Sequence, residues 1–179
     1  MSGRDDRFAS VYRAHYRHLY AYCRRRVPAD QTDDLVADVL LAVWRRIEDA
    51  PSDAVLPWLY RVAHLTASNH WRALRRQRRL REKLDSLGVS PPEPVADQIV
   101  AREEVTKALD VLQEMRPADR EIIKLSVWEQ LSNEEIARVL DLTAEATRQR
   151  LHRAKSRLAE LYSKHTEASS PAAQEGGAR

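Results

Sequence analysis

The stretch LSNEEIARVLDLTAEATRQRLHRAKSRL, which runs from Leu131 to Leu158, predicts two short helices separated by a tight turn. Ser132 and Glu135 form the S-x-x-E pattern of a capping box, in which two side chains satisfy free backbone N–H groups at a helix start. Residues 141–142 fall at the turn, and Thr143 can cap the helix that follows. The sequence therefore predicts a helix-turn-helix unit.

The second helix of this unit, expected over residues 144–162, has two contrasting faces. One face carries Thr147, Leu151, Ala154, Leu158 and Leu161. The other face carries Glu145, Arg148, Gln149, His152 and Arg153. Arginine pairs with guanine edges and glutamine with adenine edges in the major groove, so the second face is suited to reading duplex DNA. A solvated charged helix is the alternative interpretation, and the capped helix and short turn before it favour DNA binding.

The composition favours a helical protein with folded cores. Of the 179 residues, 43% are hydrophobic and only 4 are glycine, which argues against hairpins and glycine-rich phosphate loops. The net charge is +3, but basic residues cluster at residues 24–26 and 72–83, as expected for contact with a polyanion. Cys23 is the only cysteine, which excludes an internal disulfide and a cysteine zinc cluster. Because no apolar run approaches the length of a signal or membrane helix, we expect a cytoplasmic protein.

Apolar spacing elsewhere in the chain predicts further helices and no strands. The expected helices span residues 8–27, 33–47, 58–83, 99–115 and 118–129. The segment LDSLGVSPPEPVADQ, residues 84–98, is rich in proline and is typical of an interdomain linker. The prediction is an all-α fold with two small helical domains. Their ranges are 6–83 and 98–162, with a flexible linker over 84–97 and a disordered polar tail over 163–179.

The third expected helix mixes aromatic and basic side chains. Trp58, Tyr60 and Trp71 accompany Asn69 and arginines at residues 72, 75, 76, 78 and 79. Stacking platforms beside cations are what single-stranded nucleic acid requires. Core packing is the alternative for Trp58 and Tyr60, whereas Trp71 lies among polar residues and is the better candidate for exposure.

The second expected helix has an acidic start and a basic end. Carboxylates such as Asp34 and Asp38 are stabilised near a helix N-terminus by the helix dipole. Together with Arg45 and Arg46, they also form a mixed polar face that is suited to binding a protein partner.

Residues 6–162 resemble the extracytoplasmic-function (group 4) bacterial RNA polymerase sigma factors of the sigma-70 family. The resemblance is carried by DDLVADVLLAVWRR, PWLYRVAHLTASNHWR and LSNEEIARVLDLTAEATRQRLHRAKSRL, in this order and spacing. It implies sigma regions 2 and 4 in a promoter-specificity subunit that has no enzymatic activity and needs no cofactor. The implied partners are core RNA polymerase, through its β′ clamp and β flap, promoter DNA, and an anti-sigma factor.

The resemblance also implies three groups of contact residues. Core polymerase would be bound by Asp34, Leu35, Asp38, Trp44 and Arg45. The minus-ten element would be opened and held by Trp58, Tyr60, Arg61, His64, Asn69, Trp71, Arg72, Arg75 and Arg76. The minus-thirty-five element would be read by Ser132, Thr143, Arg148, Gln149, His152 and Arg153. The loop over residues 48–57 would capture a flipped minus-ten base, and the linker would thread toward the polymerase active-site cleft.

Four residues, at three places in the chain, depart from the pattern of that family. His64 and Leu65 stand where an Arg-Asn pair is frequent, and the apolar Leu65 cannot make the hydrogen bonds of an asparagine. Thr147 stands where valine or isoleucine is usual, and its methyl group can still pack. Glu145 occupies a small-residue position, where a carboxylate either repels phosphate or accepts a hydrogen bond from a cytosine amine.

Two other classes of function remain open from the sequence. A polymerase-independent helix-turn-helix regulator would bind duplex DNA alone, at two-fold half-sites. A protein-interaction module that captures an anti-sigma factor would not need the arginines at the end of the third helix. An enzyme is disfavoured because no catalytic pattern stands out, and a metal site because His15 and His18 have no evident third ligand. We expect a monomer when the protein is free.

Overall fold

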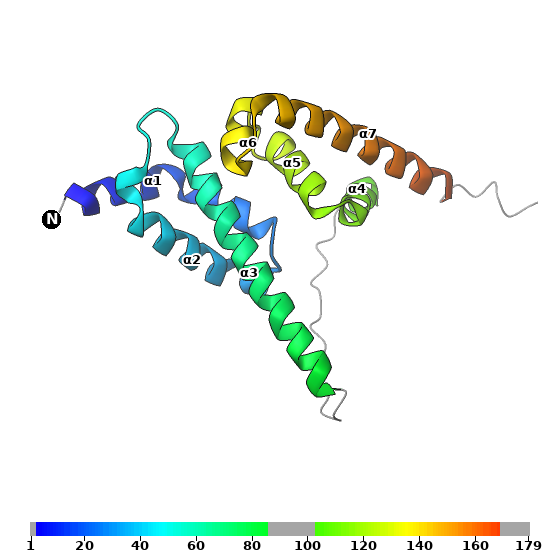
Figure 1. Cartoon of the computed structure of the whole chain (residues 1–179), viewed down its shortest axis with the longest axis horizontal. Helices are drawn as coiled ribbons and strands as arrows, with labels where there is room; N and C mark the ends of the chain where they lie inside the picture. The colour runs from blue at the N-terminus through cyan, green and yellow to red at the C-terminus, as the bar shows by residue number, and fades with distance from the viewer. Residues whose placement is uncertain (1–2, 86–102, 169–179) are drawn as a thin grey trace, which may run out of the picture. The chain divides into compact units, whose positions relative to one another are not determined.

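The computed structural model describes residues 3–85 and 103–168, and its regular structure within these ranges is entirely helical (Figure 1). The chain divides into two compact units, formed mainly by the first three and the last four of the described α-helices. This confirms the predicted all-α fold. The predicted linker lies outside the described residues, except that Leu84 and Asp85 end the third α-helix.

Three α-helices and two short 3-10 turns build the first unit, and each α-helix packs against the other two. They are α1 (Gly3–Arg24), η1 (Ala29–Gln31), α2 (Thr32–Arg45), η2 (Ile47–Asp49) and α3 (Val55–Asp85). Prolines mark two of the boundaries. Pro28 follows the end of α1, and Pro57 lies in the first turn of α3. Proline is tolerated there because the N–H groups of the first turn make no hydrogen bond within the helix.

The core of the first unit follows the four-residue apolar repeat of α2. Leu35 and Val43 are buried on one side of this helix, as the spacing predicted. Tyr22 of α1 stacks on Tyr60 of α3 with ring centroids 5.3 Å apart, and Cys23 is also fully buried. Because burying one such apolar side chain contributes about 1.5–3 kcal/mol, this repeat fixes which side of α2 faces inward.

Four α-helices build the second unit. They are α4 (Glu103–Glu114), α5 (Pro117–Val127), α6 (Asn133–Leu140) and α7 (Ala144–Ala168). The long α7 packs against both α4 and α5. Ile122 and Leu125 of α5, together with Leu151 and Ala154 of α7, are buried in the resulting core.

The predicted caps of the helix-turn-helix are confirmed. Ser132 Oγ accepts the backbone N–H of Glu135 at 3.2 Å, and the Glu135 carboxylate accepts the backbone N–H of Ser132 at 2.8 Å. Asp141 ends α6 in the left-handed conformation, with φ 59° and ψ 49°. Thr143 Oγ1 accepts the N–H of Ala146 at 3.1 Å and caps α7. The caps satisfy N–H groups that no carbonyl of the same helix can reach, so local sequence fixes the direction in which α7 leaves the turn.

The prediction of a disordered tail from Ser163 is wrong for residues 163–168, which continue α7. His165 Nε2 of this extension lies 3.0 Å from Glu114 Oε1 of α4. The extension is therefore held by a neighbouring helix, which the polar composition of the segment did not indicate. The remainder of the predicted tail, residues 169–179, lies outside the described part of the chain.

Candidate nucleic-acid and polymerase interfaces

The side of α7 that faces away from the core of the second unit is exposed, and we call it the reading face. It carries Glu145, Arg148, Gln149, His152 and Arg153. On the opposite side, Thr147, Leu151 and Ala154 are buried. The two contrasting faces predicted for this helix are therefore confirmed. Their separation leaves five polar or charged side chains on one surface of a helix that is entered from a tight turn.

Glu145 organises the start of the reading face. Its Oε2 accepts a hydrogen bond from Arg148 Nη2, and its Oε1 accepts one from Gln149 Nε2 at 2.8 Å. The spacing of three and four residues makes both contacts possible on one helix face. An arginine has five N–H donors, so Arg148 keeps donors for a base or a phosphate while its guanidinium is oriented by the carboxylate.

Arg150 ties α7 to α5 and lies to one side of the reading face. Its Nε donates to Asp119 Oδ1 at 3.3 Å, and both side chains are partly buried. This contact gives Arg150 a structural role in joining the two helices.

Ser132 and Thr143 act first as helix caps. A hydroxyl that accepts an N–H still has its own O–H proton to donate to a phosphate.

A stripe of partly or fully exposed side chains runs along α3, and we call it the α3 stripe. Its members recur at intervals of three and four residues, which places them on one side of a helix. They are Trp58, Arg61, Leu65, Asn69, Arg72 and Arg76. Arg72 Nη2 donates to Asn69 Oδ1 at 2.7 Å. The stripe thus combines an aromatic ring, an amide and three arginines, with the apolar Leu65 between them.

His64, Trp71 and Arg75 flank the α3 stripe. Trp71 is 38% exposed, which agrees with the prediction that it is the more accessible tryptophan of this helix. It meets the ring of His70 edge-on, with centroids 6.3 Å apart. His70 Nε2 in turn lies 3.1 Å from Gln31 Oε1, so the neighbour of the exposed indole is anchored to η1.

Two predicted contact residues belong to the core instead. Tyr60 is 2% exposed because its ring stacks on Tyr22, so it offers no stacking platform to a base. Leu35 is 0% exposed because it packs inside the three-helix core, so it is not accessible to polymerase. Both residues are removed from the candidate interfaces. Apolar or aromatic character alone did not distinguish a buried position from an exposed one.

The outward side of α2 carries an acidic start and a basic, aromatic end. Asp34, Asp38, Leu41 and Arg45 recur at intervals of four, three and four residues and are all exposed. Trp44 lies beside them and is also exposed. Sequence reasoning missed Leu41, although its place one turn after Asp38 puts it on the same side of the helix. We call these five residues the α2 surface.

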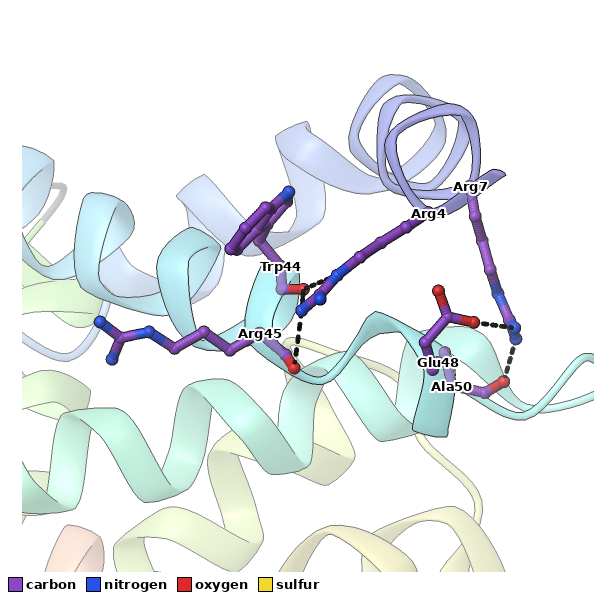
Figure 2. A network of polar contacts seen from close by, with 6 residues as sticks. All are labelled: Arg4, Arg7, Trp44, Arg45, Glu48 and Ala50. Atoms are coloured by element: carbon purple, nitrogen blue, oxygen red, sulfur yellow. Dashed lines mark hydrogen bonds and ion pairs between the residues drawn. The ribbon is translucent and has the colours of Figure 1, made fainter. Parts of the chain in front are cut away.

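Two arginines at the start of α1 contact the end of α2 and the turn after it (Figure 2). Arg4 donates from Nε and Nη2 to the Trp44 carbonyl at 3.3 and 2.9 Å, and from Nη2 to the Arg45 carbonyl at 3.0 Å. Its guanidinium carbon lies 4.4 Å from the centre of the Trp44 ring. Arg7 donates to the Ala50 carbonyl and lies 3.8 Å from a Glu48 oxygen. The sequence prediction began this helix at residue 8 and therefore missed both arginines.

Within residues 3–85 and 103–168, no helix is long and apolar enough to cross a membrane. In the same ranges, no three side chains of His, Cys, Asp or Glu are grouped so that they could hold a metal ion.

Comparison with known proteins identifies the family. The sigma-70 region 2 model matches residues 11–77, and the sigma-70 region 4 model matches residues 106–158. The chain is 32% identical over 163 residues to RNA polymerase sigma factor NccH of Alcaligenes xylosoxydans xylosoxydans, covering 86% of each protein. The chain is an ECF-type sigma factor of the sigma-70 family. As such it is a non-enzymatic subunit that directs promoter-specific transcription initiation by RNA polymerase.

Further relatives agree with this assignment. The sigma factor is 33% identical over 159 residues to the RNA polymerase sigma-E factor of Streptomyces coelicolor, covering 86% of this chain and 84% of that one. The fold is similar to that of CnrH, solved in complex with the cytosolic domain of CnrY, with a TM-score of 0.62 at 24% identity over 91% of this chain and 89% of that one. It is equally similar to RpoE of Bartonella quintana, solved with the anti-sigma factor NepR, with a TM-score of 0.62 at 24% identity over 86% and 95%.

Membership of this family confirms the resemblance and decides between the functions left open by the sequence. A polymerase-independent regulator and an interaction module that captures an anti-sigma factor are both set aside, because the matched relatives are sigma factors and the matches include regions 2 and 4.

Proposed function

We propose that the sigma factor contacts its promoter at two places, with α7 reading the minus-thirty-five duplex and α3 holding unpaired bases of the minus-ten element. The observation that carries the proposal is the α3 stripe. From Trp58 to Arg76 it extends about 27 Å at 1.5 Å per residue. An exposed surface of this length, with an aromatic ring and several cations, suits the stacked bases and phosphates of single-stranded DNA.

The proposed opening mechanism needs no chemical step. Taking a base out of the duplex stack costs a few kcal/mol, and stacking it on an aromatic side chain returns about 1–3 kcal/mol. Trp58, Trp71 and the segment over residues 48–57, which includes the loop before α3, are the proposed sites for such bases. Arg72, Arg75 and Arg76 are the proposed phosphate partners, since they are exposed cations on or beside the same stripe. Trapping of transiently unpaired bases then drives strand separation.

In the minus-thirty-five element, we assign base contacts to Arg148 and Gln149 and phosphate contacts to later cations of the reading face. Arginine bonds guanine O6 and N7 in a bidentate manner, and glutamine bonds adenine in the same way. Ser132 and Thr143, which lie at helix starts, are the proposed hydroxyl donors to phosphate. Each domain offers only a small interface, so we expect binding to be strong only when polymerase holds both domains at once.

The proposed binding site for core polymerase on the first domain is the α2 surface. Its support is the exposure of Asp34, Asp38, Leu41, Trp44 and Arg45 on one side of the helix. Tryptophan and arginine are enriched at protein interfaces, and carboxylates such as those of Asp34 and Asp38 add charge that a basic partner surface can complement. The partner proposed for this surface is the β′ clamp, and the partner proposed for the second domain is the β flap.

We also propose that the sigma factor is held by an anti-sigma factor when it is inactive. Two proteins of similar fold were solved in complexes, one with the cytosolic domain of CnrY and one with the anti-sigma factor NepR. These complexes support an anti-sigma partner for this chain. A partner that covers exposed residues of the α2 surface would compete directly with polymerase.

The test is co-elution of the purified chain with core RNA polymerase, followed by transcription from a promoter near its own gene. We expect a complex and a transcript with a defined start. Arg148→Ala should weaken minus-thirty-five binding by about 1–3 kcal/mol. Arg157→Ala is the matched control, because Arg157 is an exposed cation further along α7 that pairs with Glu160 at 3.8 Å.

The polymerase contact is tested by the same elution with Asp38→Ala, for which we expect weaker retention of core. Asp30→Ala is the control, since Asp30 is an exposed acid on η1 outside the α2 surface. Equal retention of both variants would contradict the assignment of the α2 surface. Equal promoter binding by the Arg148 and Arg157 variants would contradict the assignment of the reading face.

A further inference from the structure

Arg4 and Arg7 join three segments that sequence patterns treat separately: the start of α1, the end of α2 and the turn that leads to α3 (Figure 2). Arg4 binds two consecutive backbone carbonyls, those of Trp44 and Arg45. Arg7 binds the carbonyl of Ala50, which is the residue after η2. Both arginines precede residue 11, where the match to sigma region 2 begins.

The contacts of Arg4 have a clear physical cause. The last carbonyls of a helix have no partner within that helix, and the helix dipole makes this end partly negative. A guanidinium satisfies both conditions, because it is a cation with several N–H groups in a planar fork. Arg4 therefore caps α2 from another helix, across 40 residues of sequence.

The same guanidinium also orients a side chain of the α2 surface. It lies over the Trp44 ring at 4.4 Å from the centroid, within the range of a cation–π interaction. Trp44 remains 40% exposed. One face of the indole is thus covered by a cation while much of the ring stays accessible, so the orientation of the ring is set before any partner arrives.

Arg7 acts on the loop between η2 and α3, residues 50–54. By binding the Ala50 carbonyl and lying 3.8 Å from Glu48 Oε2, it fixes the point at which this loop leaves the folded domain. Ser52 and Asp53 at the centre of the loop are exposed. The loop is part of the segment proposed above to capture an unpaired base, and its shape depends on where its first residue is held.

We propose that Arg4 and Arg7 are positioning residues with separate tasks: Arg4 presets Trp44 for core polymerase, and Arg7 presets the loop over residues 50–54 for an unpaired minus-ten base. This inference rests on the proposed function of the α2 surface and of the loop. The two tasks are separable, because the two side chains bind different carbonyls on opposite sides of η2.

The first test measures the affinity of the full-length sigma factor for core RNA polymerase. Arg4→Ala should weaken it about tenfold, equivalent to about 1.4 kcal/mol, and Arg4→Lys should recover part of the loss because lysine keeps the charge and can reach one carbonyl. Arg13→Ala is the matched control, since Arg13 lies on the same helix and donates only to Ala9 of its own helix in the described structure. Equal affinities of the Arg4→Ala and Arg13→Ala variants would overturn the assignment of Arg4.

The second test measures binding of the holoenzyme to a single-stranded oligonucleotide that carries the non-template minus-ten sequence. Arg7→Ala should weaken this binding about tenfold and slow opening of the duplex promoter, while the affinity for core stays at the level of the Arg13→Ala variant. A general loss of structure would instead lower core affinity and oligonucleotide binding together, and that joint loss would overturn the assignment of Arg7. So would oligonucleotide binding equal to that of the control.

Two direct variants separate this inference from the proposed function beneath it. Trp44→Ala should weaken core binding, and the double substitution Ser52→Ala, Asp53→Ala should weaken oligonucleotide binding. If these variants behave as expected and the arginine variants match the control, the inference fails and the proposed function stands. If Trp44→Ala or the loop variant leaves its own binding step unchanged, the proposed role of that surface fails first, and the role of the arginine that positions it fails with it.

Discussion

On the reading face of α7, Glu145 accepts a hydrogen bond from Arg148, one turn further along the helix. The same carboxylate accepts a second bond from Gln149 at 2.8 Å. The pairing orients two side chains proposed to touch bases, and it places a negative charge on a surface proposed to face phosphate. Both effects are properties of the free protein. The orientation of the two side chains favours selectivity among bases, whereas the negative charge lowers the affinity for DNA.

We therefore expect Glu145→Ala to bind duplex promoter DNA more strongly but less selectively. Removal of one repulsive charge should steepen the dependence of log affinity on log salt by up to about one. The release of Arg148 should relax the base preference at the position that it contacts. Holoenzyme binding to duplexes substituted at each upstream base pair, at several salt concentrations, measures both quantities. Glu160→Ala is the control, and an unchanged salt dependence relative to it would contradict the prediction.

Leu65 lies in the middle of the α3 stripe and is 41% exposed. We expect Leu65→Asn to create a new preference for one unpaired base, because an amide supplies a donor and an acceptor that leucine lacks. A well-placed pair of such hydrogen bonds discriminates by about 1–3 kcal/mol, whereas stability should change by less than about 0.5 kcal/mol. Affinities for single-stranded minus-ten oligonucleotides with each base in turn provide the measurement. If Leu65→Ala shows the same preferences as Leu65→Asn, hydrogen bonding by the new amide is not the cause.

The hydroxyl of Thr147 is a weak point of the second domain. The residue is 0% exposed, and among the described residues its Oγ1 has no hydrogen-bond partner. Burying a polar group in this way costs about 1–3 kcal/mol, so Thr147→Val should raise the free energy of unfolding by about 1 kcal/mol. Chemical denaturation measures the change. Thr66→Val is the matched control and should not stabilise, because Thr66 Oγ1 donates to the Val62 carbonyl at 2.9 Å.

His15 should make the stability of the first domain depend on pH. Burial, and to a lesser extent the nearby His18, lower the pKa of His15 below its ordinary value of about 6.5. Among the described residues, its Nδ1 is also buried without a hydrogen-bond partner. The unfolded chain therefore binds this proton more readily than the folded chain does. The contribution of neutral His15 to the free energy of unfolding is fully present above pH 6.5. It is lost as the pH falls from there through the lower pKa of the folded state.

Urea unfolding between pH 7.5 and pH 5 measures this pH dependence of stability. The His15→Gln variant should lose part of it. His18→Gln should shift the titration of His15 upward, because it removes a neighbouring charge. Titration of the imidazole signals by NMR gives the pKa of each ring directly. A His15 titration at or above the ordinary value would contradict the prediction.

The helix-turn-helix was predictable because its determinants are local. Ser132, Glu135 and Thr143 each act on backbone groups three residues away, and such patterns can be recognised in a single sequence. The buried side of α2 was predictable for a similar reason. Leu35 and Val43 follow a helical repeat, and the hydrophobic effect places such a repeat against a core.

Contacts across long sequence separations were not predictable in this way. Arg4 and Trp44 are 40 residues apart, and Arg7 and Ala50 are 43 apart. No periodic signal in the polar start of the chain marks either pair. The assignment of Tyr60 failed for the same reason, because only its stacking on Tyr22 of another helix distinguishes it from an exposed ring.

The burial of Cys23 has a practical chemical consequence. It is the only cysteine of the chain and is 0% exposed, and thiol reagents react with accessible thiolates. A cysteine introduced by Ser156→Cys on α7, or by Ser52→Cys in the loop before α3, would be the only readily labelled thiol in the natural background. Fluorescent dyes can therefore be attached to either domain without first replacing Cys23, and the arrival of each domain on a promoter can be timed separately.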